Sequence, residues 1–193
     1  PVSSRTRPRA DAYRRDVAAG FLVPVYDRGA RVVADGLGYT NEVQLHPSGR
    51  WLYVNETFGR RTSRMTIGAD GSLGKRQTVA EYGYGTFPDG LCFAENGDFW
   101  VVSLVSNRII HVARDGTQTV LIEDVDAEFL AQVEAAYQSG TIKSHLLRSV
   151  SSIAFGGRDR RSSYLGCLLD DRIMTYRSPI AGVSPVHWHW RAK

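Results

Sequence analysis

The sequence predicts an all-β fold, a β-propeller of which this chain holds only a part, with one inserted helix. The first observation is a stretch that occurs twice, because residues 41–54 and 89–102 align without a gap at a spacing of 48 residues (89 minus 41). The second is a succession of short strand-like runs separated by turn residues. Self-similarity at a period of about 40–50 residues is typical of repeat architectures. Four-stranded antiparallel units at that period are propeller blades.

A weaker third copy covers residues 151–157 and places Ser151 in register with Asn41 and Asp89. Each copy therefore opens on a short side chain that carries an oxygen. In a propeller, equivalent positions of successive blades lie at the same end of neighbouring strands. We expect these three residues to come together.

The strands before the first copy are predicted at residues 20–26 and 30–34, around an Asp27–Gly29 turn. Turn dipeptides such as Asp115–Gly116 supply the positive φ that tight hairpins need. The second copy resolves into four strands, at residues 89–94, 98–103, 108–113 and 117–122.

Counting strands gives about three to four blades, the first incomplete. We therefore expect one domain over residues 1–193, the C-terminal part of a propeller, with the missing blades supplied by upstream sequence or a second chain. The basic segment 1–19 is interpreted as part of an interrupted earlier blade.

A helix is predicted near residues 126–138, where the apolar residues follow helical spacing. Asp126 is a suitable N-cap and Gly140 a suitable stop. Insertions between repeats lie on one face, often the binding face. The helix is therefore either a packing element between blades or a cover over that face.

Composition narrows the functional classes. The net charge is +4, and no run of 18 apolar residues suggests a membrane span. Arginines cluster in the first fifteen residues without interleaved aromatic residues, so a solvated or carboxylate-facing loop is favoured over nucleic-acid binding. Cys92 and Cys167 lie in apolar runs, which favours two reduced thiols over a disulfide and a cytoplasmic protein.

From residue 20 to residue 181 the chain resembles the gluconolactonase, senescence-marker-protein (regucalcin) and luciferin-regenerating-enzyme family. The matching segments are residues 39–41, 47–54, 70–74, 87–91, 97–101 and 154–157. The resemblance implies a six-bladed calcium-binding propeller whose inner strands begin at the mouth of a central channel.

The resemblance implies that Asn41 and Asp89 are metal ligands and that Asp89 is a possible general base. The family's glutamate ligand and a further asparagine ligand have no counterpart in this chain. Glu42 stands where the family usually has glycine, and it either adds a carboxylate near the mouth or points outward. Glu42 and Ser151 are predicted to contact substrate.

Amide and carboxylate oxygens suit calcium, with magnesium or manganese as alternatives, and they suit zinc poorly. A bound cation polarises a carbonyl and acidifies a bound water. The implied reaction is therefore hydrolysis of a small lactone or ester. Asn41 and Asp89 could instead serve only as turn residues that bond nearby backbone.

The alternative function is a non-catalytic propeller that binds a ligand or a protein at its mouth. Condensation chemistry of the strictosidine-synthase kind, without calcium, is disfavoured by the retention of Asn41 and Asp89. His187 and His189 would share one face of a strand, but they lack a third metal ligand, so an outer strand is the favoured interpretation.

Overall fold

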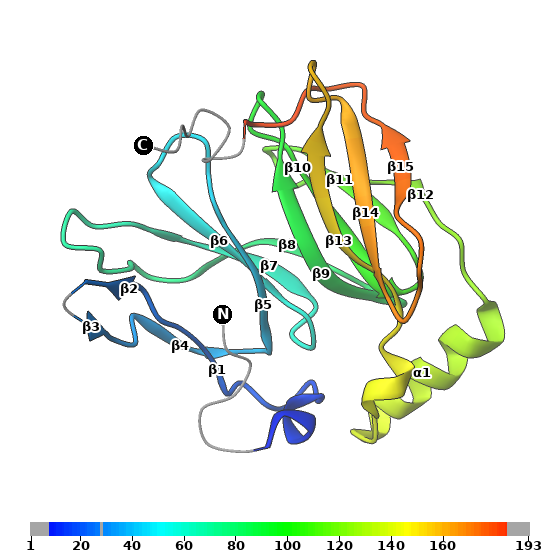
Figure 1. Ribbon diagram of the computed structural model, residues 1–193. Coiled ribbons are helices and arrows are strands. Elements are labelled where there is room, and N and C mark those ends of the chain that lie inside the picture. The colour runs from blue at the N-terminus through cyan, green and yellow to red at the C-terminus, as the bar shows by residue number, and fades with distance from the viewer. Residues whose placement is uncertain (1–7, 28, 185–193) are drawn as a thin grey trace.

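The computed structural model describes residues 8–27 and 29–184. It is built mainly from antiparallel sheets set side by side, with one long helix at one end (Figure 1). Sheet 1 contains β5 (Thr40–Leu45), β6 (Trp51–Glu56), β7 (Arg61–Thr66) and β8 (Gln77–Glu81). Sheet 2 contains β9 (Thr86–Phe93), β10 (Phe99–Val105), β11 (Ile109–Val112) and β12 (Gln118–Ile122). Sheet 3 contains β13 (Ser149–Gly156), β14 (Ser162–Leu168) and β15 (Met174–Arg177).

Each of these sheets is a meander in which consecutive strands pair. The four strands predicted in the second copy are confirmed as β9 to β12. The strands β5, β9 and β13 each open their sheet, and β9 contacts both of the others. The described residues form a mostly β structure without a closed ring, and the number of blades in the whole protein stays a prediction.

Apolar side chains fill the two spaces between the sheets. Tyr53 of sheet 1 packs with Leu91, Phe93 and Phe99 of sheet 2. On the other face of sheet 2, Trp100 packs with residues of sheet 3. Large side chains, several of them aromatic, thus fill the interior on both faces of sheet 2.

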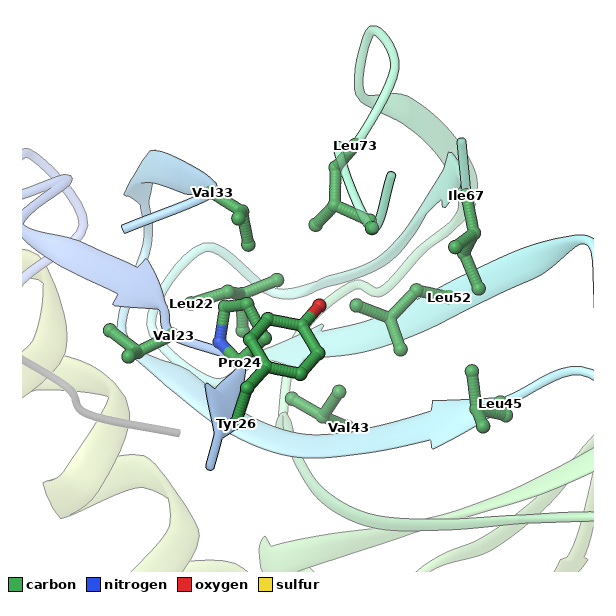
Figure 2. Close-up of a pocket in the computed structure, with 11 residues that line it drawn as sticks. Leu22, Val23, Pro24, Tyr26, Val33, Val43, Leu45, Leu52, Ile67 and Leu73 are labelled. Atoms are coloured by element: carbon green, nitrogen blue, oxygen red, sulfur yellow. The ribbon is translucent and has the colours of Figure 1, made fainter. Parts of the chain in front are cut away.

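The segment before sheet 1 forms two small pairs, β1 (Gly20–Leu22) with β4 (Ala34–Leu37) and β2 (Val25–Tyr26) with β3 (Gly29–Ala30). The predicted strand over residues 20–26 is broken after Leu22. Between these pairs and the outer face of sheet 1 lies an apolar cavity of 330 Å³ (Figure 2). Leu22, Val43 and Leu52 are among its lining residues.

The predicted helix is confirmed as α1 (Ala127–Ser139). The Asp126 carboxylate accepts a hydrogen bond of 3.0 Å from the Phe129 N–H, as an N-cap does. Gly140 ends the helix with φ of 70°, a left-handed conformation that glycine adopts at little cost. A short 3-10 turn, η2 (Ser144–Leu146), leads on to β13.

The N-terminal segment is tied to α1. It contains a 3-10 turn, η1 (Arg9–Ala12), and Tyr13 packs in one cluster with Tyr39, Phe58 and Tyr137. Arg14 pairs with Asp16 at 2.7 Å. This pairing fits the expectation of a carboxylate-facing loop, while the assignment of residues 1–19 to an earlier blade stays a prediction.

Cys92 and Cys167 are both free thiols, as expected. The residues 187–190, considered above as an outer strand, lie outside the described part of the chain. No helix within residues 8–27 and 29–184 is long and apolar enough to cross a membrane.

Candidate active site

The strands that open the three sheets each carry a β-bulge at the residue that opens the sequence repeat. The bulges fall at Asn41–Glu42 in β5, at Asp89–Gly90 in β9 and at Ser151 in β13. A bulge bends its strand and re-aims the side chains at that point. Three independent pairings thus deviate at one aligned position. We call the end of the sheets where these strands begin the mouth end.

Close backbone contact joins two of the bulges. A side-chain carbon added to Gly90 would lie 2.7 Å from Ser152 Cα and 3.0 Å from the Ser151 carbonyl oxygen. Only glycine allows β9 to approach β13 this closely. The Ser151 hydroxyl, half-buried, donates to the Gly166 carbonyl at 3.4 Å. The bulges of β9 and β13 are therefore direct neighbours.

A hydrogen-bond chain joins the third bulge to the same place. The Asn41 side chain donates from Nδ2 to the Thr57 hydroxyl at 3.0 Å, and that hydroxyl donates to the Pro88 carbonyl at 2.8 Å. Because the amide nitrogen is used in this way, the orientation of the Asn41 side chain is fixed. Its Oδ1 accepts no hydrogen bond from the described residues.

Asn55 of β6 holds the next two carbonyl groups of β9. Its Nδ2 donates to the Asp89 carbonyl at 2.8 Å and lies 3.4 Å from the Gly90 carbonyl. Its Oδ1 accepts from the Thr62 hydroxyl at 2.6 Å. Asn55 and Thr57 thus hold three consecutive carbonyl groups from a neighbouring sheet. Both side chains are buried, and in a buried position such bonds strongly fix geometry.

The carboxylates at the mouth end differ in environment. Asp89 is only 8% exposed. Glu42 is half-buried, and burial raises the pKa of its carboxyl group, partly offset by a hydrogen bond from Gln44. Burial, and next the charge of Glu42, raise the pKa of the Cys92 thiol. Glu42 is thus close enough for its charge to act on Cys92 of β9.

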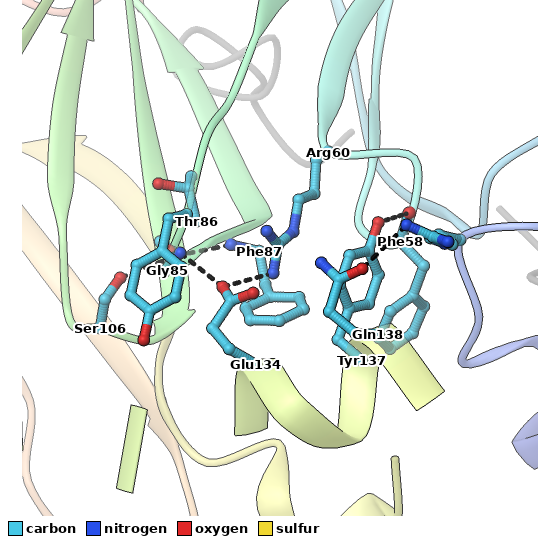
Figure 3. A network of polar contacts seen from close by, with 12 residues as sticks. Phe58, Arg60, Gly85, Thr86, Phe87, Ser106, Glu134, Tyr137 and Gln138 are labelled. Atoms are coloured by element: carbon cyan, nitrogen blue, oxygen red, sulfur yellow. Dashed lines mark hydrogen bonds and ion pairs between the residues drawn. The ribbon is translucent and has the colours of Figure 1, made fainter. Parts of the chain in front are cut away.

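Helix α1 lies at this same end and braces the loops that lead into the site (Figure 3). Glu134 Oε1 accepts from Arg60 and from the Gly85 N–H, both at 2.6 Å. The Arg60 guanidinium lies over the rings of Phe87 and Tyr137 at 4.3 and 4.0 Å. The helix therefore fixes the entry to β9, the strand that carries Asp89.

Tyr137 adds a further link between α1 and sheet 1, because its hydroxyl donates to the Phe58 carbonyl at 2.8 Å. Phe58 belongs to the loop between β6 and β7, directly after Thr57. Of the two interpretations of the inserted helix, these contacts support a packing element. They place it at the mouth end, beside the residues that hold Pro88 and Asp89.

The structure thus brings Asn41, Asp89 and Ser151 to adjacent positions and sets Glu42 beside them. The sequence reasoning missed Asn55 and Thr57. A signal was present, since residues 55–57 are a polar run in a strand that otherwise reads as apolar. Such a run inside a buried strand needs partners, which here lie in the next sheet.

The donor set fits a hard cation only in part. Asn41 and Asp89 offer amide and carboxylate oxygens, and calcium takes six to eight such ligands. Within residues 8–27 and 29–184 no group of three or more His, Cys, Asp or Glu side chains could hold a metal ion. Asn41 and Asp89 alone would offer fewer oxygens than calcium takes.

Known proteins resemble the chain both in sequence and in structure. A 6-deoxy-6-sulfogluconolactonase of Pseudomonas putida is 26% identical over 161 residues, which cover 82% of this chain and 48% of that enzyme. A luciferin-regenerating enzyme superposes with a TM-score of 0.65 at 17% identity, over 88% of this chain and 55% of that one.

The regucalcin of Agrobacterium tumefaciens, a calcium-binding protein, gives a TM-score of 0.60 at 17% identity, over 87% of this chain and 55% of that protein. These likenesses show that the fold is shared. The chain spans about half the length of the relatives it matches. The model of the SMP-30/gluconolactonase/LRE-like region matches residues 7–126, more than half of the chain. The chain belongs to the SMP-30/gluconolactonase/LRE-like family.

Proposed function

We propose that this chain contributes to a calcium-dependent lactonase, with Asn41 and Asp89 as metal ligands. The main support for this proposal is the set of aligned bulges. They lie in neighbouring strands and contain an amide, a carboxylate and a hydroxyl side chain. Family membership supports lactone hydrolysis as the reaction class. The Pseudomonas putida relative, a 6-deoxy-6-sulfogluconolactonase, supports a sugar lactone as substrate.

Asp89 is the residue that we assign as general base. Its backbone carbonyl is held by Asn55, and the residue is only 8% exposed, so the protein packs closely around it. A positioned base of this kind accelerates proton transfer by about 10²–10⁴-fold. A bound calcium ion would supply polarisation of the lactone carbonyl and acidification of a water molecule.

Glu42 and Ser151 are assigned to the substrate. Both are half-buried and flank the bulges of Asn41 and Asp89. Sugar lactones carry hydroxyl groups. The Glu42 carboxylate can accept hydrogen bonds from these groups, and the Ser151 hydroxyl can accept hydrogen bonds from them or donate to them. Magnesium or manganese would use the same oxygens but with stricter octahedral geometry.

We propose that polypeptide outside this chain completes both the ring and the ligand set, either as upstream sequence or as a second chain. The support is the exposed Leu45 on sheet 1 and the exposed Tyr164 and Leu168 on sheet 3. Apolar faces of this kind are normally covered in a folded protein. We therefore expect lactone hydrolysis from the longest natural polypeptide that contains this chain.

The test is hydrolysis of small lactones, including gluconolactone and 6-deoxy-6-sulfogluconolactone, by that polypeptide with and without a calcium chelator. We expect chelation to abolish turnover and added calcium to restore it. Asp89→Asn should lower kcat by about 10²–10⁴-fold, since it removes the base and keeps the shape. Asp115→Asn, a matched change in an exposed turn, should leave kcat unchanged.

Hydrolysis that persists in chelator would remove the metal from the proposal, and full activity of Asp89→Asn would remove Asp89 as the base. Calcium-dependent binding of a lactone without any turnover would instead favour the non-catalytic binding propeller.

A further inference from the structure

A second concave site lies between sheets 1 and 2, at the end opposite the mouth, where hairpins join the strands. Its volume is 150 Å³. We call it the hairpin pocket. Residues that line it include His46, Ser48, Arg50, Trp51, Arg64 and Arg114. Its walls come from the turn after β5, from β6 and β7, from the turn before β10 and from the turn after β11.

The charged side chains that line this pocket are all positive. Arg50, Arg64 and Arg114 all line it, and no Asp or Glu does. Among the described residues, none of these three guanidinium groups forms an ion pair with a carboxylate. Other arginines of the chain behave differently, as Arg61 pairs with Glu56 and Arg108 with Glu123. Three unneutralised cations around one concavity repel each other and favour a bound anion.

The guanidinium of Arg64 is held in place rather than free in solvent. It lies over the ring of Trp51 at 4.3 Å. Its Nε donates to Gln77 Oε1 at 3.2 Å, and one terminal nitrogen lies 3.4 Å from the Tyr53 hydroxyl. Stacking and neutral partners orient the group without cancelling its charge. A planar, oriented guanidinium is suited to bind two oxygens of one anion.

His46 presents a further donor to the pocket. The Ser48 N–H donates to His46 Nδ1 at 3.1 Å, and because a backbone N–H can only donate, the ring proton is on Nε2. Nε2 lies 3.6 Å from the place of a side-chain carbon on Gly97, another lining residue. Burial, followed by the charges of Arg64 and Arg50, lowers the pKa of His46. At neutral pH the ring is therefore a neutral Nε2–H donor.

We propose that the hairpin pocket binds a small tetrahedral dianion, the chemistry shared by inorganic phosphate, sulfate and the terminal group of a phosphate monoester. Its donors are Arg64 and the Nε2–H of His46, with Arg50 and Arg114 at the rim. Its volume is far above the roughly 10–15 Å³ that one water molecule needs. Oxyanions are bound best by such charge-assisted donors.

This site is independent of lactone hydrolysis. Both of its walls lie within this chain, so no further blade is needed to complete it. His46 follows the far end of β5 from Asn41, and Gly97 follows the far end of β9 from Asp89. The anion would therefore link the hairpin ends of two sheets without contacting the lactone site.

The test is titration of the protein with inorganic phosphate, sulfate and glycerol 3-phosphate at constant ionic strength, read by calorimetry and by the NMR signals of the His46 ring. We expect saturable binding that chloride does not reproduce. Because hydrogen bonds to charged groups contribute about 1.5–3 kcal/mol each, Arg64→Met should weaken binding by about tenfold to a hundredfold. The matched variant Arg172→Met, in an exposed turn of sheet 3, should bind as the parent protein does.

Arg50→Met, at the exposed rim, serves as a second variant if loss of the Trp51 contact impairs folding of Arg64→Met, and it should weaken binding more than Arg172→Met. Binding of the monoester without binding of the free ions would assign the source as an organic phosphate. Absence of saturable binding, or equal affinity in the Arg64, Arg50 and Arg172 variants, would overturn the proposal.

Discussion

The mouth end and the hairpin end of sheets 1 and 2 are held together in different ways. At the mouth end, contacts join residues far apart in the sequence, as in Asn55 to Asp89 and Arg60 to Glu134. At the hairpin end, some polar side chains bond within their own turns, as in Asn96 to Asp98, and the long-range pair of Arg160 with Glu95 is exposed. The hairpin end therefore relies on turn bonds and exposed pairs, whereas the mouth end relies on buried contacts between distant residues.

We infer that the contacts at the hairpin end serve mainly to stabilise the fold, whereas those at the mouth end also position the proposed site. Turns that are satisfied locally need no neighbouring sheet and tolerate change. At the mouth end, buried polar side chains hold the backbone of residues 88–90 in a bulge. Buried polar groups are costly unless every partner is present. We infer that this cost is retained because it positions Asp89.

The largest expected contrast concerns ion pairs at the two ends. Glu134→Ala leaves the charge of Arg60 buried and the Gly85 N–H without its acceptor, so we expect a loss of about 3–5 kcal/mol in the free energy of unfolding. Glu95→Ala at the hairpin end breaks an exposed pair with Arg160 and should cost about 1 kcal/mol or less. Denaturant unfolding measures both. Equal losses would break the comparison.

A smaller contrast is expected for asparagines. Asn55→Ala removes the donor to two carbonyl groups and the acceptor of Thr62, and should cost about 1–3 kcal/mol. Asn96→Ala, whose partner is two residues away, should cost about 0.5 kcal/mol.

Asn55 bonds the Asp89 carbonyl, and Thr57 bonds Asn41 and the Pro88 carbonyl. A positioning role for these two residues needs a kinetic readout in addition to stability. Thr57→Val should lower kcat for lactone hydrolysis more than it changes KM, whereas Thr57→Ser, which keeps the hydroxyl, should restore it. Matching kcat values in the two variants at temperatures where both are folded would show that Thr57 is only structural.

The smallest expected effect is a pH dependence of stability from Glu56. Burial alone would raise the pKa of this carboxyl, but hydrogen bonds from Arg61, the Gly38 N–H and Ser63 outweigh it and lower the pKa. A lowered pKa in the folded state stabilises the protein above the unfolded value of about 4.5. Stability from Glu56 should therefore decline as the pH falls below that value, and Glu56→Gln should flatten the decline in acid denaturation curves.

The sequence predicted the hairpin turns and the ends of α1 well, because both are marked by local signals. The dipeptide Asp115–Gly116 marks a turn, and Asp126 with Gly140 marks the ends of α1. The alignment of Asn41 with Asp89 and Ser151 also picked out the three positions that carry bulges in β5, β9 and β13, because a repeat fixes equivalent positions. The polar run at residues 55–57 is visible in the sequence, but the partners of Asn55 and Thr57 could not be predicted, because they depend on how two sheets pack.

The most direct test of the account is an experimental structure, with calcium, of the longest natural polypeptide that contains this chain. We predict that one calcium ion lies at the mouth end, with Asn41 Oδ1 and an Asp89 carboxylate oxygen within about 2.3–2.6 Å of it. The bulges at Asn41, Asp89 and Ser151 should surround that ion. A calcium ion bound elsewhere, or Asn41 and Asp89 both turned away from it, would contradict the account.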